Sequence, residues 1–218
     1  VKDDFESIFD TKKSVEVLYN TNESEKIKKL SDEKVDDVNF SKDIINIISV
    51  AKIVPSKGYD RLMKIHKKLI EENIKNHIYI LGIGEEKEKY EKYLTENNLT
   101  DTFTFLGYRD NPYKYVRKAD LYVCSSRREG FSTAVTEALI VGTPVVSTNC
   151  SGAYELLGKN NEYGIVTEND EDALYEGIKK MLTTPDLLEA YAAKAKERGK
   201  AFSTEKTVKA VEEMLENL

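Results

Sequence analysis

The sequence predicts an α/β fold in which a parallel sheet carries helices on both faces. Short apolar runs and amphipathic segments of helical period alternate from about residue 43 to the end of the chain, and this alternation is typical of β-α-β units. The strongest strand pattern, residues 44–50, is apolar at almost every position. Strands of this kind are buried on both faces, so we place this one near the centre of the sheet.

Short apolar runs that end in glycine or polar residues mark the remaining strands. They cover residues 15–19, 78–81, 102–106, 119–124 and 144–147. The run 119–124 leads into a polar turn of two serines and two arginines. This turn matters because ligands bind at the carboxyl ends of the strands in open α/β sheets.

Helices of 3.6-residue period separate these strands. One begins after Gly58, a Lys/Glu-rich helix follows Gly84, and a short helix starts near Pro112. The helix after residue 131 has Ser132 as its N-cap candidate, and residues 170–182 form another helix. Each strand is thus followed by a helix that can cover one face of the sheet.

Two more helices are predicted near the C-terminus. Pro185 after Thr184 is typical of a helix start, and Ser203 is placed to cap the last helix. The apolar stripe of this last helix consists of Val208, Val211, Leu215 and Leu218.

Composition limits the function classes. With 40% hydrophobic residues and no apolar run near 18 residues, the chain shows neither a transmembrane span nor a signal peptide. A net charge of -6 gives no reason to expect nucleic acid, which calls for a basic face. We therefore expect a cytoplasmic protein.

Metal chemistry has little support in the sequence. There is no CxxC pattern, and His66 and His77 are the only histidines, so a zinc site is not expected. Asp170-Glu171-Asp172 formally matches D-x-D, but it opens a helix, where the dipole alone favours acids. Cys124 and Cys150 are expected to be buried and reduced, as in a cytosolic protein.

One predicted helix and its flanks are basic. An ordinary solvated face accounts for this charge, and peripheral contact with the inner face of a membrane is the alternative. The residues are Lys57, Arg61, Lys64, Lys67, Lys68 and Lys75.

The most informative segment is residues 128–139. Glu129 lies before a helix, and Glu137 follows eight positions later, roughly 7 Å along the helix axis at 1.5 Å per residue. The free N–H groups and positive dipole end of the helix suit a phosphate. A diphosphate there would leave an attached ribose near Glu137 and the other end of the ligand near Glu129. Alternatively, both glutamates are solvated and Ser132 is only a cap.

This segment resembles the E-x₇-E signature of glycosyltransferase family 4, a family of retaining enzymes with the two-domain GT-B fold. The similar residues run from Glu129-Gly130-Phe131-Ser132 through Glu137-Ala138-Leu139. A second match lies at residues 50–58, where Lys57-Gly58 fits the family as it stands. Ala51 and Lys52 stand where the family usually has Gly and Arg, and a lysine lacks the bidentate fork of an arginine. The resemblance covers residues from about 43 to 218 and implies a Rossmann-like sheet, the C-terminal half of a GT-B fold.

The resemblance also implies a site for a UDP- or GDP-sugar. Lys57, together with Lys52, would bind the diphosphate, Glu129 the sugar hydroxyls, and Glu137 the ribose. Lys57 and Glu129 are the catalytic candidates, and no metal or other cofactor is expected. The other donor-binding residues that it implies are Gly82, Gly84, Tyr108, Arg109, Gly130, Phe131, Ser132 and Thr133.

The glycines of Gly82-Ile83-Gly84 have three interpretations. They suit a tight turn, or a loop that lets the donor approach closely. They also begin a dinucleotide pattern, but Lys87 occupies the place of its third glycine, so an NAD-dependent enzyme is disfavoured. We favour the close approach of the donor.

Two domains are expected. Residues 1–41 resemble the tail of a preceding N-terminal domain followed by a charged linker, and residues 42–218 form the donor-binding domain. The function that the resemblance implies is hexose transfer to a glycan or glycolipid acceptor, as in cell-surface polysaccharide biosynthesis. A non-catalytic sugar-nucleotide-binding module and a GT-B-type sugar-nucleotide epimerase are the alternatives. The N-terminal acceptor domain would be a partner that this chain lacks.

Overall fold

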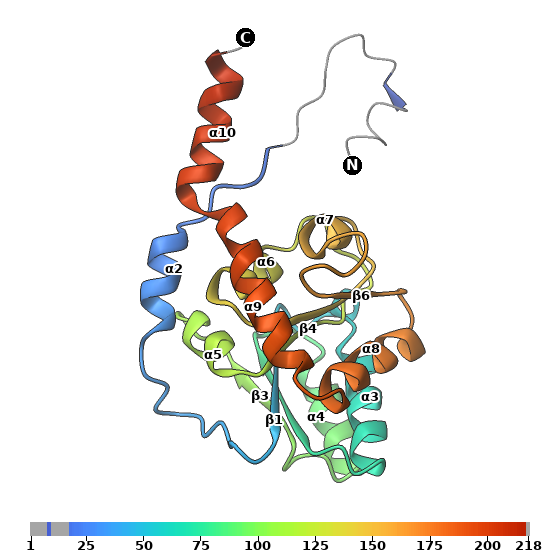
Figure 1. Cartoon of the computed structure of the whole chain (residues 1–218). Helices are drawn as coiled ribbons and strands as arrows, with labels where there is room; N and C mark the ends of the chain where they lie inside the picture. Colours follow the sequence, from blue (N-terminus) through green and yellow to red (C-terminus); the bar gives the residue numbers. More distant parts are fainter. Residues whose placement is uncertain (1–7, 10–17, 217–218) are drawn as a thin grey trace.

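Six parallel strands form a single sheet in the computed structural model, which describes residues 8–9 and 18–216 (Figure 1). Their order is β3-β2-β1-β4-β5-β6, and every neighbouring pair is parallel. The strands are β1 (Ile45–Val50), β2 (Asn76–Leu81), β3 (Phe103–Gly107), β4 (Leu121–Cys124), β5 (Val145–Thr148) and β6 (Ile165–Thr167). The predicted α/β fold is confirmed, with β1 near the centre of the sheet.

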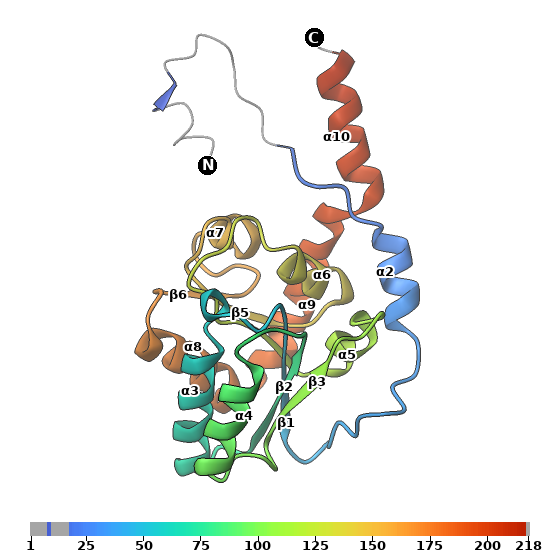
Figure 2. The same cartoon turned by 180° about the vertical axis from the view of Figure 1, so that it is seen from behind.

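Helices cover both faces of the sheet because its strands are apolar on both sides. Successive residues of one strand point to opposite faces: Ile47 lies in one core cluster and Ile48 in the other. One face packs against α3 (Tyr59–Glu71), α4 (Lys87–Glu96) and α8 (Glu171–Thr183), which Figure 2 shows together. The other face packs against α5 (Tyr113–Lys118), α6 (Thr133–Val141), α7 (Ala153–Leu157) and α9 (Leu187–Gly199).

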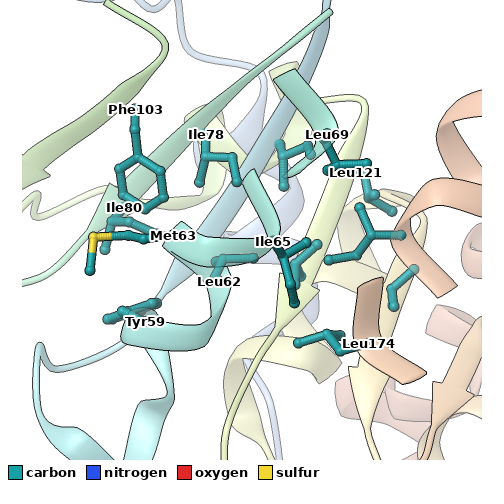
Figure 3. Close-up of a cluster of buried hydrophobic side chains, with 14 of the residues drawn as sticks. Tyr59, Leu62, Met63, Ile65, Leu69, Ile78, Ile80, Phe103, Leu121 and Leu174 are labelled. Atoms are coloured by element: carbon teal, nitrogen blue, oxygen red, sulfur yellow. The ribbon is translucent and has the colours of Figure 1, made fainter. Parts of the chain in front are cut away.

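The first of these clusters fixes α3 against the sheet. Leu62 and Ile65 of α3 point toward the strands, where Ile78 and Leu121 meet them (Figure 3). His66 of the same helix is fully buried, and its ring nitrogens contact Asn76 Oδ1 at 2.8 Å and Thr102 Oγ1 at 2.9 Å. Burial lowers the pKa of His66 to about 4, so this histidine is a core residue.

The N-terminal part differs from the prediction. Residues 15–17 of the predicted strand lie outside the described residues, and Leu18 and Tyr19 are not in a strand. The segment expected as a charged linker contains a helix, α2 (Ser24–Ser31). Its residue Ile27 is buried, and α2 packs against α5 and α6. An amphipathic helix was missed here because charged residues surround a single buried apolar position.

Hydrogen bonds join α2 to the last helix, α10 (Thr204–Glu216). The amide of Ser24 donates to Thr204 Oγ1 at 3.1 Å, and the amide of Thr204 donates to Ser24 Oγ at 3.1 Å. The first residue of each helix thus accepts the backbone N–H that the first residue of the other helix cannot pair within its own helix. This pairing places α2 beside the start of α10 (Figure 1).

Other differences concern the C-terminal third. The strand β6 was not predicted. The helix α9 begins at Leu187, two residues later than Pro185 suggests, because Asp186 has a left-handed backbone with φ 58°. Ser203 caps α10 as expected, by accepting from the amide of Lys206 at 3.3 Å. The side chain of Leu215 in the predicted stripe is 60% exposed, and Leu218 lies outside the described residues.

Candidate functional site

A cavity of about 360 Å³ opens at the carboxyl ends of β1 and β4. The strand order reverses between these two strands, and open α/β sheets bind ligands at such a switch point. The loops after β1 and β4 and the start of α6 form the walls. Six of the predicted site residues line this cavity: Lys52, Lys57, Glu129, Phe131, Ser132 and Thr133.

Lys57 and Glu129 form an ion pair inside the cavity. The Nζ of Lys57 lies 2.5 Å from Oε1 of Glu129, and the two side chains are 22% and 18% exposed. Ser126 Oγ donates to the same carboxylate oxygen at 2.9 Å. The sequence placed these two charges in one site by resemblance, and the structure brings them into direct contact.

Close contact between the loops after β1 and β4 positions this pair. Gly58 has φ +69°, and a Cβ on it would lie 2.1 Å from the carbonyl oxygen of Ser125. Only glycine fits this approach. Ser125 Oγ donates to the carbonyl oxygen of Lys57 at 2.8 Å, so the lysine backbone is held by the loop that carries its partner.

Arg61 of α3 holds the start of the β4–α6 loop, residues 125–132, by hydrogen bonds to its backbone. Its side chain is buried, and its guanidinium donates to the carbonyl oxygens of Ser125 at 2.6 Å and Ser126 at 2.7 Å. It also donates to Asn169 Oδ1 at 2.9 Å. The sequence counted Arg61 among the basic residues of a solvated face, and this was wrong. No sequence signal separates a buried arginine from its exposed neighbours on the same helix.

The start of α6 faces the cavity. Ser132 is the N-cap, since its Oγ accepts from the amide of Val135 at 3.4 Å. The first turn contains no acidic residue, and Thr133 and Ala134 line the cavity. Because the first N–H groups of a helix lack partners within it, this end is suited to an anion.

Glu137 lies deeper along α6 and does not line this cavity. Tyr113 Oη donates to Glu137 Oε1 at 3.2 Å. Burial raises the pKa of Glu137, and the hydrogen bond from Tyr113 offsets part of this rise. Tyr113 was not among the predicted site residues, because α5 was recognised only by its proline start.

Tyr113 lines a second hollow of about 450 Å³, together with Gly82, Tyr108 and Arg109. This hollow shares three residues with the first cavity: Val50, Ala51 and Lys52. The two hollows therefore adjoin at the end of β1. Lys52 is exposed at their junction.

The glycines at 82 and 84 are explained by chain packing. A Cβ on Gly82 would lie 1.9 Å from the carbonyl oxygen of Ala51, and one on Gly84 would lie 2.1 Å from that of Ile53. The loop after β2 therefore lies directly on the loop after β1. This contact alone requires both glycines, and the close approach of a donor that we favoured from the sequence stays a prediction. Gly82 lines the second hollow, whereas Gly84 lines neither.

Arg109 and Tyr108 have different surroundings. Arg109 forms an ion pair with Asp37 at 3.1 Å, and Tyr115 Oη donates to the same carboxylate at 2.8 Å. Tyr108 is 66% exposed. The side chain of Arg109 is thus engaged with the segment before β1.

The remaining candidates have local roles. Asp170 Oδ1 accepts from the amide of Ala173 at 2.8 Å as the N-cap of α8, and Glu155 lies in the first turn of α7. Among residues 8–9 and 18–216, no group of three or more His, Cys, Asp or Glu residues could hold a metal ion. Cys124 and Cys150 are free, but only Cys124 is fully buried. The same described ranges contain no helix of the length and hydrophobicity that a bilayer span requires.

Residues 31–198 match the family described as glycosyl transferases group 1. The chain belongs to this family. It is 34% identical over 192 residues to the N-acetylgalactosamine-N,N'-diacetylbacillosaminyl-diphospho-undecaprenol 4-alpha-N-acetylgalactosaminyltransferase of Campylobacter jejuni, with 87% of this chain and 50% of that protein covered. It is 23% identical over 172 residues to the lipopolysaccharide core biosynthesis glycosyltransferase LpsD of Rhizobium meliloti, covering 79% of this chain and 49% of that one. The chain therefore spans about half the length of these relatives.

Solved structures of other glycosyltransferases share the fold. Anabaena Alr3699/HepE in complex with UDP superposes with a TM-score of 0.77 at 19% identity, over 93% of this chain and 57% of that one. S. aureus TarM, in a complex that contains UDP, gives a TM-score of 0.75 at 22% identity, over 95% and 40% of the two chains. This group 1 member therefore shares its fold with these structures.

Proposed function

We propose that this chain is the donor-binding domain of a retaining, family 4-type glycosyltransferase whose acceptor domain precedes it. The observation that carries the proposal is the Lys57–Glu129 pair beside the open start of α6. A cation and free helical N–H groups on one side of a cavity suit a diphosphate. A carboxylate next to them suits sugar hydroxyls.

The rest of the donor is placed along the two adjoining hollows. We place the diphosphate at Lys57 and the first turn of α6, the sugar against Glu129, and the ribose toward Glu137 and Tyr113. The base would occupy the second hollow, where Tyr108 and Gly82 lie. UDP is the proposed nucleotide, because solved neighbours of the same fold carry UDP in their complexes.

In the proposed reaction the bond between the anomeric carbon and the diphosphate oxygen breaks, an acceptor hydroxyl oxygen bonds to that carbon on the same face, and the hydroxyl proton passes to the departing diphosphate. Negative charge then grows on the departing diphosphate, and Lys57 with the α6 N–H groups stabilises it. Lys52, exposed at the junction of the two hollows, would add charge without a bidentate contact. We propose that these groups act without a metal ion, and that the configuration at the anomeric carbon is retained.

The proposed acceptor is a glycan or glycolipid, and the transferred unit a hexose or N-acetylhexosamine. The names of the relatives support both acceptor classes, since one refers to a diphospho-undecaprenol and another to lipopolysaccharide core. Residues 1–41 are proposed as the end of the acceptor domain and its connection. A protein acting on such acceptors would work at the inner face of the membrane, where its lipid substrate is presented.

Isothermal titration calorimetry tests the proposal. UDP, GDP, UDP-glucose, UDP-N-acetylglucosamine, UDP-N-acetylgalactosamine, GDP-mannose and NAD are titrated into the chain. We expect a dissociation constant in the micromolar to millimolar range for UDP and one of its sugars, about -8 to -4 kcal/mol, and no binding of NAD. Binding of NAD, or failure of every nucleoside diphosphate to bind, would overturn the proposed function.

A further inference from the structure

We propose that Tyr19, which lies ahead of α2, is a positioning residue for the β4–α6 loop and acts through Phe131. The proposal rests on the proposed function in so far as this loop carries Glu129. It assigns to the segment before α2 a part in shaping the donor site, although this segment does not line the cavity.

Three aromatic rings from three parts of the chain meet beside the cavity. The ring of Tyr19 stacks on Phe131 with centroids 5.2 Å apart and an angle of 29°. Both rings contact Phe202, at 5.3 Å and 6.2 Å, and Phe202 is fully buried. Phe131 also lines the 360 Å³ cavity. It therefore belongs to the cavity wall and to this aromatic cluster at once.

The β4–α6 loop depends on side chains for its shape. Among the described residues, no backbone N–H of residues 128–131 donates to a backbone oxygen. Glu129 is held at one end by Lys57 and Ser126, and Ser132 is fixed at the other end as the N-cap of α6. Between them, a Cβ on Gly130 would meet no atom within 4 Å, whereas one on Gly152 would lie 3.2 Å from Gly130 O and 3.1 Å from Phe131 Cδ2. The middle of the loop thus packs through the Phe131 ring and against Gly152.

Tyr19 is well placed to support Phe131. Its ring is half-buried, and burial followed by the neighbouring Glu155 carboxylate raises the pKa of its hydroxyl. Arg198 also lies near this hydroxyl, and it donates to the carbonyl oxygen of Leu156 at 3.0 Å. Tyr19 thus bridges from α7 and α9 to the loop. Its removal leaves one side of the Phe131 ring without a partner.

The consequence is that the segment before α2 is coupled to the donor site. Tyr19 precedes α2, so any displacement of the segment before α2 moves the ring that supports Phe131. The loop then loses packing while the Lys57–Glu129 pair and the α6 cap remain. We expect such a change to loosen the loop and to weaken the binding of the sugar end of the donor more than that of bare UDP.

Hydrogen exchange in the free protein gives the first test. Wild type, Tyr19→Ala, Tyr19→Leu and Tyr19→Phe are compared in the full chain, with Phe40→Ala as the control. Phe40 is also a half-buried aromatic residue before β1, but it packs on Tyr79 at 4.8 Å. We expect exchange in residues 128–135 to rise about 2- to 10-fold in Tyr19→Ala, the range for one aromatic pair. Tyr19→Leu should show a smaller rise, and Tyr19→Phe and Phe40→Ala none.

Binding and a double variant complete the test. Tyr19→Ala should weaken UDP-sugar binding by about 2- to 10-fold and bare UDP by less. In the Phe131→Ala background, the same substitution should have no further effect, because it acts through Phe131. Unchanged exchange in the folded Tyr19→Ala and Tyr19→Leu variants would overturn the inference. If wild type binds no nucleotide, the proposed function fails, whereas exchange in residues 128–135 still decides the role of Tyr19.

Discussion

The Nζ of Lys57 and Oε1 of Glu129 lie 2.5 Å apart although 72 positions separate the two residues in the chain. The free protein therefore pairs the candidate diphosphate-binding cation with the candidate sugar-binding carboxylate. A diphosphate that binds Lys57 would meet the Glu129 carboxylate, which already pairs with this lysine. The two side chains should accordingly affect nucleotide binding in opposite ways.

Replacing the cation Lys57 should weaken the binding of every nucleotide. Lys57→Ala should lower the affinity for UDP by about 1.5–3 kcal/mol, the range for a hydrogen bond to a charged group, with the melting temperature nearly unchanged. Calorimetry measures the affinity, and Lys64→Ala serves as the charge-matched control, because Lys64 pairs with Glu171 at 3.3 Å on the surface. An unaltered affinity of Lys57→Ala for UDP would remove this lysine from the site.

Replacing the carboxylate of Glu129 should affect the binding of the UDP-sugar and of bare UDP differently. Glu129→Gln should bind bare UDP at least as tightly as wild type, because Lys57 is released and a like charge is removed. The same variant should bind the UDP-sugar about 10-fold more weakly, as expected from the loss of a charge-assisted hydrogen bond of about 1.4 kcal/mol or more. Ser126→Ala should give the same pattern in weaker form. Equal losses for UDP and UDP-sugar in Glu129→Gln would show that the ends of the donor are assigned wrongly.

The raised pKa of Glu137 predicts a pH dependence of UDP binding. Protonation removes the charged acceptor that the ribose hydroxyls require, so the affinity should fall as the pH decreases toward the pKa of Glu137. Glu137→Gln should bind UDP more weakly at neutral pH and lose the part of the pH dependence that this carboxyl contributes. Calorimetry from pH 8 to pH 5 with both proteins measures the difference. Parallel pH profiles for wild type and Glu137→Gln would exclude Glu137 from the ribose contact.

The buried histidine predicts a pH dependence of stability. Burial lowers the pKa of His66 to about 4, whereas an unfolded histidine has a pKa of about 6.5. The unfolded chain therefore binds more protons between these values, and the free energy of unfolding should fall as the pH decreases, with His66 contributing on the order of 2 kcal/mol of this loss by pH 5. Burial also lowers the pKa of His77 to about 4, which adds to the loss. Urea denaturation at pH 7.5 and pH 5 measures this loss. His66→Gln, less stable at pH 7.5, should show a smaller decrease between the two pH values.

The chain alone should bind donor without transferring sugar. Transfer requires that donor and acceptor are held together. The effective molarities of 10⁵ M or more that enzymes reach depend on both the donor-binding and the acceptor-binding domain. Under our proposal only the end of the acceptor domain, within residues 1–41, belongs to this chain. A radiolabelled UDP-sugar assay with lipid-linked acceptors measures turnover. Transfer at the rate of an ordinary enzyme would contradict the proposal that donor and acceptor bind to different domains. Appearance of an epimerised sugar nucleotide would favour the epimerase.

The sheet could be predicted because its signals are local. Apolar runs such as residues 44–50 mark parallel strands, and Ser132 and Ser203 mark helix starts by their own hydrogen bonds. The three-residue strand β6 was missed, since so short a run has no periodicity to detect. The helix α2 was missed because its stability comes from contact with α5 and α6, which the local sequence does not display.

The site could be predicted only in part, for a similar reason. The motifs named Lys57 and Glu129 but not their contact, which depends on Gly58 meeting the loop after β4. Ser126 appeared as one serine of a polar turn, and Tyr113 as a residue in a short helix. Tyr113 acts through Glu137, which is 24 positions away. Ser126 binds Glu129 only three positions later, but a polar turn does not show which of its side chains will meet. The glycines at 82 and 84 fitted several interpretations until the packing of the loop after β1 was known.

The reciprocal hydrogen bonds of Ser24 and Thr204 constrain when this domain can finish folding. The two residues are 180 positions apart, so a ribosome working at about 5–20 residues per second makes the second one roughly 10–35 s after the first. During this interval the first amide of α2 has no partner at residue 204, although α5 and α6, on which α2 packs, are made earlier. The first helix to leave the ribosome among those described here is thus one of the last to be completed. A chain that stopped before Thr204 would have its sheet and the packing of α2 complete, but not the hydrogen bonds at the first turn of α2.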